Sequence, residues 1–196
     1  MLGKTKISKP EITMYATRRD FCRIFKENMD GLYLLAFLLT ADHAMAEKCF
    51  VRGLRGSAKS NAVFKEWAES WARRTIIRKA IQMVKPRQSG NQDISGEPIR
   101  FAGRSAGELP EVRAIAGVSA FERFVFVMSV LERYSDRDTA LLLNCSRADV
   151  IAARTQAVQQ IGASAELRQK LESITGGDDP LKAPHGPDFR MAAISA

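Results

Sequence analysis

Hydrophobic residues recur along most of the chain at intervals of three and four positions, whereas alternation of single apolar and polar residues is scarce. Apolar residues at intervals of three and four form one face of an α-helix. The pattern predicts helices over residues 17–40 with a break near Gly31, over 43–54, over 62–84, from Glu111 onward, and over 164–175. We therefore expect an all-α fold.

Two stretches interrupt this pattern. Residues 55–61, RGSAKSN, have the composition of a loop. Residues 85–110 hold three prolines and four glycines among scattered apolar residues, which is typical of an interdomain linker. We expect two small helical bundles, residues 17–84 and 111–176, joined by a flexible linker, with an N-terminal tail over 1–16 and a flexible tail over 177–196.

The stretch SDRDTALLLNCSRADVIAARTQAV, residues 135–158, carries two helix start signals 11 residues apart. Ser135 and Ser146 are each followed three positions later by an aspartate, as in a capping box. Asn144 lies between them, where a tight turn needs a left-handed residue. The spacing predicts a helix-turn-helix.

Apolar positions support this prediction. Ala140 is small where the two helices should cross, and Val150 is the residue expected to meet it. Val150, Ala153, Ala157 and Ile161 then form a stripe that faces the core. The opposite face contains Arg147, Ala148, Ile151, Ala152, Arg154, Thr155 and Gln159. These side chains can contact base edges and phosphates.

A second candidate interface lies in FKEWAESWARRTIIRKAI, residues 64–81. Trp67, Trp71, Arg74 and Arg78 share one face of the predicted helix, and Arg73 and Lys79 flank it. Aromatic rings interleaved with cations can stack unpaired bases and hold a nucleic-acid backbone. The alternative is that both tryptophans belong to the core, which we favour for the rings, while the cations contact nucleic acid.

The charge distribution adds to this interpretation. The chain has a net charge of +8, but residues 1–90 hold 18 Lys and Arg against 8 Asp and Glu. Residues 91–196 hold 12 against 14. A basic excess confined to one half favours a polyanionic partner, because phosphate contacts dominate nucleic-acid affinity.

The same residues argue against other classes of protein. No apolar stretch is long enough to cross a membrane, no signal peptide is evident, and no glycine-rich phosphate loop occurs. Cys22, Cys49 and Cys145 are odd in number and widely spaced, so we expect reduced, packed cysteines in a cytoplasmic protein. His43 and His185 are isolated. We expect no catalytic residues, metal, cofactor, membrane or small-molecule substrate.

The order of these parts resembles the bacterial RNA polymerase sigma factors of the extracytoplasmic-function group. LAFLLTADHAMAE, residues 35–47, resembles the segment that leads into their polymerase-binding helix, and residues 64–81 resemble their promoter-melting helices. Residues 114–158 resemble their fourth conserved region, at positions Arg123, Glu132, Tyr134, Ala140, Leu143, Ser146 and Val150.

This resemblance implies a mechanism and its residues. The first domain would dock on core RNA polymerase, at positions corresponding to Glu47, Lys48, Val51 and Arg52. Minus-ten promoter DNA would contact Arg73, Arg74, Arg78 and Lys79, with Lys59 and Asn61 near a flipped base. Minus-thirty-five DNA would face Arg147, Arg154, Thr155 and Gln156. An anti-sigma protein is a further candidate partner.

Two other interpretations of the residues stay open. One is a helix-turn-helix regulator that binds DNA without polymerase. The other is a sigma-like interaction protein that binds no DNA. Steep salt dependence of DNA binding separates both DNA-binding classes from the interaction protein.

Overall fold

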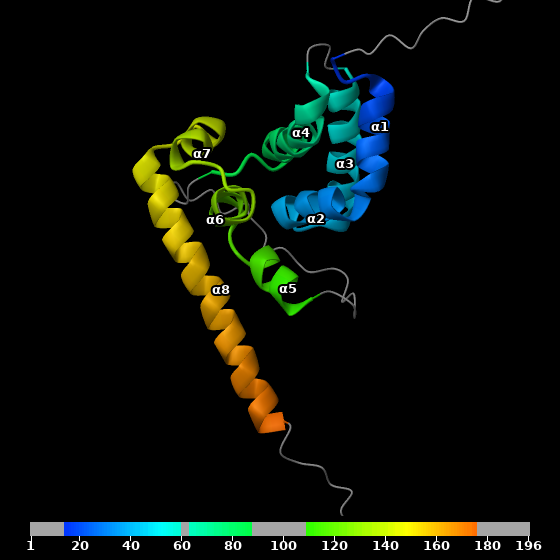
Figure 1. The fold of residues 1–196 in the computed structure, drawn as a ribbon. Helices are drawn as coiled ribbons and strands as arrows, with labels where there is room; N and C mark the ends of the chain where they lie inside the picture. The colour runs from blue at the N-terminus through cyan, green and yellow to red at the C-terminus, as the bar shows by residue number, and fades with distance from the viewer. Residues whose placement is uncertain (1–13, 60–62, 88–108, 176–196) are drawn as a thin grey trace, which may run out of the picture.

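The computed structural model of the chain describes residues 14–59, 63–87 and 109–175, and within these ranges the fold is all-α (Figure 1). The described N-terminal half holds α1 (Arg18–Glu27), α2 (Met29–Thr40), α3 (His43–Ala58), a 3-10 turn η1 (Lys65–Trp67) and α4 (Ala68–Val84). A single antiparallel bridge pairs Tyr15 with Phe64. Asn61, residues 88–108 of the predicted linker, and the two predicted tails apart from residues 14–16 lie outside the described residues.

The described C-terminal half begins with α5 (Pro110–Ala116) and α6 (Ala120–Phe126). A π-helical turn, η2 (Val127–Leu131), extends α6, and α7 (Asp136–Leu143) and α8 (Arg147–Thr175) follow. None of the helices in the described ranges is both long and apolar enough to cross a membrane.

The first predicted helix divides at Asn28 rather than near Gly31. Asn28 ends α1 with a φ of −108° and a ψ of 29°, and its amide still donates to the Ile24 carbonyl. Gly31 lies inside α2 at an exposed position, where no side chain is needed to fill the core. The start of α1 is fixed by a capping box between Thr17 and Asp20.

The third helix is longer than predicted. Asp42 caps α3 as expected, accepting a hydrogen bond from the Met45 amide at 2.7 Å. The predicted loop residues 55–58 continue this helix. Small side chains explain the extension, because Gly53 and Ser57 are buried where α3 packs closely on α4.

The separate helix predicted at 164–175 is the second half of α8. The Ser164 hydroxyl donates to the Gln160 carbonyl at 2.8 Å, so this serine bonds within the helix instead of capping a new one. The stripe predicted on the first half is confirmed, because Val150, Ala153 and Ala157 are buried.

The turn between α7 and α8 matches its sequence signals. Ser135 accepts a hydrogen bond from the Asp138 amide at 3.0 Å, and Ser146 accepts one from the Asp149 amide at 3.1 Å. Asn144 has a φ of 54°, in the left-handed region, and caps α7. The turn is therefore short and fixed at both ends.

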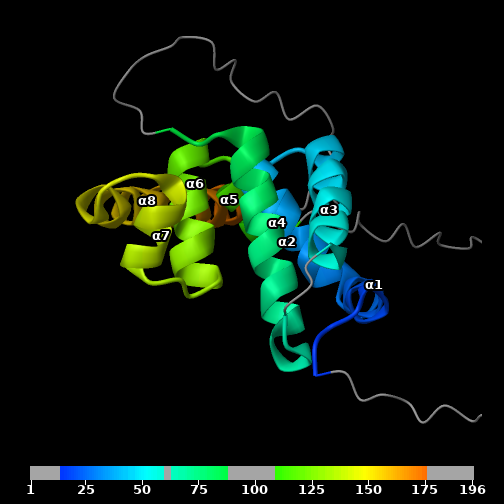
Figure 2. The same cartoon turned by 90° about the horizontal axis from the view of Figure 1, so that it is seen from above.

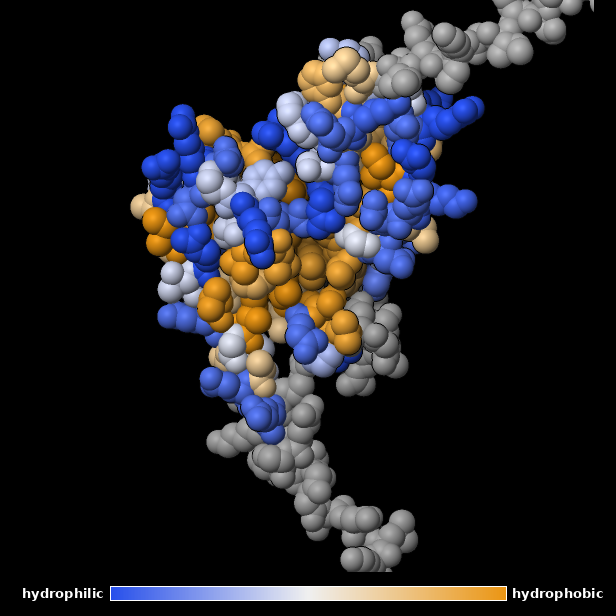
Figure 3. All heavy atoms as spheres, in the orientation of Figure 1, coloured by the Kyte–Doolittle hydropathy of each residue, from blue (hydrophilic) through white to orange (hydrophobic). Residues whose placement is uncertain are grey.

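The two predicted bundles share one core in the described residues. A single cluster of buried side chains includes Leu35 and Leu39 of α2, Ile76 of α4, and Phe124 and Met128 of the second half. Helix α2 packs on both α5 and α6. Figure 2 shows α4 between the α6–α7 pair and α3, and Figure 3 shows hydrophobic side chains gathered where α2, α5 and α6 meet. The arrangement as separate bundles is not confirmed.

One buried cation lies at this junction. Arg123 is only 1% exposed, and its guanidinium donates to the carbonyls of Val118 at 2.8 Å, Ala116 at 3.2 Å and Leu39 at 3.4 Å. Leu39 and Ala116 belong to the last turns of α2 and α5, where carbonyls lack intrahelical partners and carry negative partial charge. Burial lowers the pKa of Arg123 to about 10.

Replacing this cation should destabilise the packing between the two halves of the chain. The substitution Arg123→Met leaves three buried carbonyls without donors, so we expect a loss of roughly 2–4 kcal/mol in the free energy of unfolding, measured by urea denaturation. Arg113→Met, at an exposed arginine of α5, should change it by less than about 0.5 kcal/mol. Equal stability of the two variants would contradict this assignment.

Two glycines should respond in opposite ways to alanine. A Cβ added at Gly53 would lie 2.7 Å from Ile76 Cγ1, so Gly53→Ala should lower the free energy of unfolding by about 1–3 kcal/mol. A Cβ at Gly31 meets nothing within 4 Å, so Gly31→Ala should raise it by about 0.5–1 kcal/mol. Thermal and urea denaturation of both variants measure the difference.

Candidate nucleic-acid interface

Helix α3 presents one continuous exposed face. The four residues predicted to bind polymerase, Glu47, Lys48, Val51 and Arg52, are all exposed there. Glu47 and Val51 lie four positions apart, as do Lys48 and Arg52, and Lys48 and Val51 lie three apart. Positions three and four residues apart are neighbours on the surface of a helix. The structure therefore brings this predicted set together.

The same face carries a basic stripe that sequence reasoning missed. Lys48, Arg52, Arg55 and Lys59 are exposed at intervals of four, three and four residues. Composition predicts a loop at Arg55, yet its spacing from Lys48 signals a shared helical face. Lys79 of α4 lies beside this stripe, since a Cβ at Gly56 of α3 would sit 3.4 Å from Lys79 Cε.

The four cations predicted on α4 do not form one patch. Arg74 and Arg78 are exposed on the side of Trp71, and the Arg78 guanidinium lies 5.9 Å from the centre of that ring. Lys79 turns toward α3 and donates to Gln82 Oε1 at 3.1 Å. Arg73 turns the other way, toward the second half of the chain.

Arg73 forms a paired contact across the two halves. Its Nε donates to Glu132 Oε2 at 2.8 Å, and its Nη2 donates to Glu132 Oε1. The Glu132 side chain is only 9% exposed, and its hydrogen bond raises the pKa of Arg73. A cation predicted to hold DNA therefore connects α4 to the segment after η2.

The two tryptophans differ from our expectation of a shared core. Trp67 is 59% exposed and packs edge-on against Phe64, with ring centroids 5.3 Å apart. Trp71 is partly buried against a small cluster that contains Phe21 and Val63. Trp67 lies in η1 before the regular helix begins, which turns its ring away from the core.

A groove opens between these rings and the loop before α7. We call it the α4–α7 groove; its volume is about 510 Å³, and it is lined by Trp67, Ser70, Trp71, Arg74, Glu132, Arg133, Tyr134, Ser135 and Asp138. Burial raises the pKa of the Tyr134 hydroxyl, and the charges of Arg74 and Arg78 oppose that rise. Two cations therefore lie near this phenol.

The residues predicted to face DNA on α8 are only partly available. Arg147 and Gln156 are exposed. Arg154 is half-buried and pairs with Asp136 in the first turn of α7, through Nη1 to Oδ1 and through Nη2 to Oδ2 at 3.4 Å. The Thr155 hydroxyl donates to the Ile151 carbonyl at 3.0 Å. The Arg154 pair joins two helices across eighteen positions, which helical periodicity does not predict.

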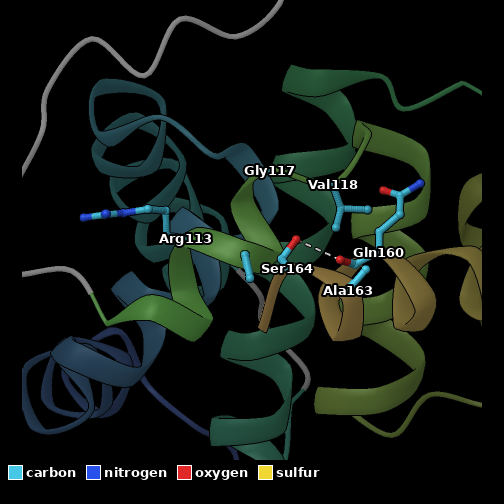
Figure 4. A pocket seen from close by; sticks show the side chains of 7 residues that line it. Arg113, Gly117, Val118, Gln160, Ala163 and Ser164 are labelled. Carbon is cyan, nitrogen blue, oxygen red and sulfur yellow. Dashed lines mark hydrogen bonds between the residues drawn. The ribbon is translucent and has the colours of Figure 1, made fainter. Parts of the chain in front are cut away.

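A second open cavity, of about 490 Å³, lies between α5 and α8. Small residues, Ala114, Gly117 and Ala163, make up much of its lining. Figure 4 shows the Arg113 side chain pointing away from Gln160 and Ser164. Of the residues that line this cavity, Arg113 alone is charged.

The described cysteines and His43 lie in different surroundings. Cys49 is buried, donates to the Ile76 carbonyl at 3.5 Å, and has its pKa raised to about 11 by burial. Cys22 is exposed, contrary to our expectation of packing, because it lies on the outer side of α1. His43 bonds through Nδ1 to the Tyr33 hydroxyl at 3.1 Å. In the described ranges, no three His, Cys, Asp or Glu side chains lie close enough to hold a metal ion.

Comparison with known protein families found no family model that matches the chain, and comparison with curated proteins found no match. A functional assignment therefore rests on the geometry of the described residues.

A double-mutant cycle should measure the contact across the halves. Arg73→Gln and Glu132→Gln each leave a partly buried charge without its partner, so each should lower the free energy of unfolding by about 1–3 kcal/mol. The double variant should lose less than the sum of the two, with a coupling of about 1 kcal/mol, measured by urea denaturation. Additive losses would show that the pair contributes nothing.

Proposed function

We propose that the chain is a sigma-factor-like transcription initiation protein that recruits core RNA polymerase to promoters. The α7–α8 pair acts as a helix-turn-helix that reads minus-thirty-five DNA. The basic surface of α4 holds minus-ten DNA, and the exposed face of α3 docks on polymerase.

The observation that carries the proposal is the geometry of the α7–α8 pair. Two serine-capped helix starts flank a left-handed Asn144, and Ala140 and Val150 are both buried in the shared core. This arrangement buries one face of the first turns of α8 and leaves the opposite face exposed. Arg147 and Ile151 project there, and arginine and apolar side chains suit guanine and the thymine methyl.

Arg154 can contribute to DNA binding if it exchanges its present ion-pair partner, Asp136, for a DNA phosphate. Its ion pair with Asp136 is about one third exposed on each side, so it is worth little in free energy. A DNA phosphate can therefore replace Asp136 at small cost.

The α3 face favours a second candidate function, a helix-turn-helix regulator that works without polymerase. The family's polymerase-binding helix is acidic and carries glutamine at positions that Lys48, Val51 and Arg52 fill here. A basic α3 suits a polyanion at least as well as a protein. The sigma-like interaction protein that binds no DNA is the third candidate.

Reconstitution with core RNA polymerase tests these functions. We expect the chain to co-elute with polymerase and to direct transcripts from specific promoters. If the α3 face docks on polymerase, Lys48→Ala with Arg52→Ala should weaken co-elution, whereas Arg18→Ala with Arg19→Ala, at exposed positions of α1, should not. The two double variants change the net charge equally.

DNA binding separates the alternatives. We expect affinity for promoter duplex to fall with salt at a slope of about −0.9 per phosphate contacted, on logarithmic axes. Steep salt dependence with no polymerase retained would favour the regulator, while binding of neither would leave the interaction protein.

A further inference from the structure

Helix α3 and the adjoining side of α4 gather cations on one surface. The basic stripe of α3 is exposed along its whole length, and Lys79 of α4 is half-buried beside it. None of these cations forms an ion pair with any described residue. The surface consists of Lys48, Arg52, Arg55, Lys59 and Lys79.

Close packing of the two helices joins Lys79 to the stripe. A Cβ added at Gly56 would lie 3.4 Å from Lys79 Cε, since α3 and α4 pack side by side (Figure 2). Burial raises the pKa of Cys49 to about 11, and the charges of Arg52 and Lys79 both oppose that rise. These two cations, one from each helix, therefore lie near the same thiol.

We propose that this surface binds the backbone phosphates of double-stranded DNA without regard to sequence. From Lys48 to Lys59 the helix rises by roughly 16 Å. This is about the rise of five nucleotides along one strand of a duplex. The row of cations can therefore follow a single strand. It adds a contact to those proposed for promoter DNA, because neither Arg52 nor Arg55 belongs to the residues assigned to the promoter elements.

The side chains of the stripe suit phosphates rather than bases. Stacking of a base needs an accessible aromatic face. Phe50 is the one aromatic residue of α3 besides the ring of His43, and it is half-buried, edge-on against Phe25 with ring centroids 5.2 Å apart. Contacts to phosphates alone carry no sequence information.

Negative charge is scarce near the stripe. Glu47 is the only acidic residue within α3, and Glu69 is the only one within α4. Glu69 precedes Lys79 by ten positions, which is roughly 15 Å along the helix. The surface therefore attracts a polyanion.

A nucleic acid suits this surface better than a protein or a membrane. Protein interfaces are depleted in lysine and enriched in aromatic residues, whereas three of the five cations here are lysines. Helices that lie on membranes carry a broad apolar face beside their cations. Val51, at 43% exposed, is the only large hydrophobic residue of α3 that is exposed.

The choice of DNA over RNA rests on the proposed function. A helix that reads base edges from the major groove needs B-form DNA, because the major groove of A-form RNA is too narrow for side chains to read. Lys48 and Arg52 also belong to the face proposed for polymerase. Duplex and polymerase therefore compete for α3.

The experiment measures binding of a short fluorescein-labelled DNA duplex by anisotropy over a range of salt concentrations. Each phosphate contact contributes about 0.9 to the slope of log affinity against log salt. We expect Arg52→Gln with Arg55→Gln to lower this slope by about 1.8 and to weaken binding roughly ten-fold or more at low salt. A second duplex of unrelated sequence should show the same losses.

Matched variants serve as controls. Arg23→Gln with Lys26→Gln removes two exposed cations of α1 at the same three-residue spacing, and should lower the slope by less than about 0.5. Val51→Ala should leave the affinity unchanged, because phosphates make no use of an apolar side chain. Glu47→Gln removes the acid of α3 and should strengthen binding. Circular dichroism verifies that each variant is folded.

Unlabelled competitors identify the polyanion. The DNA duplex should displace the label at a lower concentration than a poly-glutamate peptide of equal charge or an RNA duplex of the same length. Displacement by poly-glutamate at the same concentration as by DNA would assign the surface to an acidic protein and overturn the proposal. Tighter binding of the RNA duplex would overturn the choice of DNA.

The remaining outcomes separate this inference from the proposed function. An unchanged salt slope in the Arg52→Gln, Arg55→Gln variant would overturn the α3 assignment and leave the promoter contacts of α4 and α8 intact. The expected loss of slope, together with no polymerase binding and no promoter-specific transcripts, would support α3 and overturn the sigma-like function alone. Failure of the wild-type chain to bind any duplex would overturn both.

Discussion

The packing of the two halves depends on one buried cation. Arg123 satisfies its guanidinium with main-chain carbonyls alone, from the ends of α2 and α5 and from Val118. Two helix dipoles thus point their negative ends at the same charge. This arrangement needs α2 to end at Thr40, where the left-handed Ala41 leaves the Leu39 carbonyl free of an intrahelical partner. The junction is set by backbone as much as by side chains.

The surface is organised around this junction. The shared core places α4 beside the loop that precedes α7. The Arg73–Glu132 ion pair then connects α4 directly to this loop. The exposed cations of these surfaces lie in three places. One is the stripe on α3, another is Arg74 and Arg78 beside Trp71, and the third is Arg147 at the start of α8. The exposed cations of the described residues therefore lie in separate places rather than in one patch.

Local signals in the sequence predicted local structure well. The caps at Asp42, Ser135 and Ser146 and the turn at Asn144 each depend on residues within four positions, so their chemistry is visible in the chain. The Arg123–Leu39 contact and the Arg73–Glu132 and Arg154–Asp136 pairs join residues 18 to 84 positions apart, and no periodicity encodes them. The exposure of Trp67 does not follow from helical periodicity, because Trp67 lies in the 3-10 turn η1 and not in the regular helix that the periodicity assumes.

Helix α8 continues beyond the buried residues of its first half. Its buried stripe ends at Ala157, with Ile161 partly buried, and residues 162–166 are exposed, yet the helix continues to Thr175. An isolated helix of that remaining length, about fourteen residues, is marginal in water because nucleation is costly. The packed turns act as the nucleus from which the outer turns propagate. Helicity in the last turns of α8 should therefore depend on whether its first turns remain packed against α7.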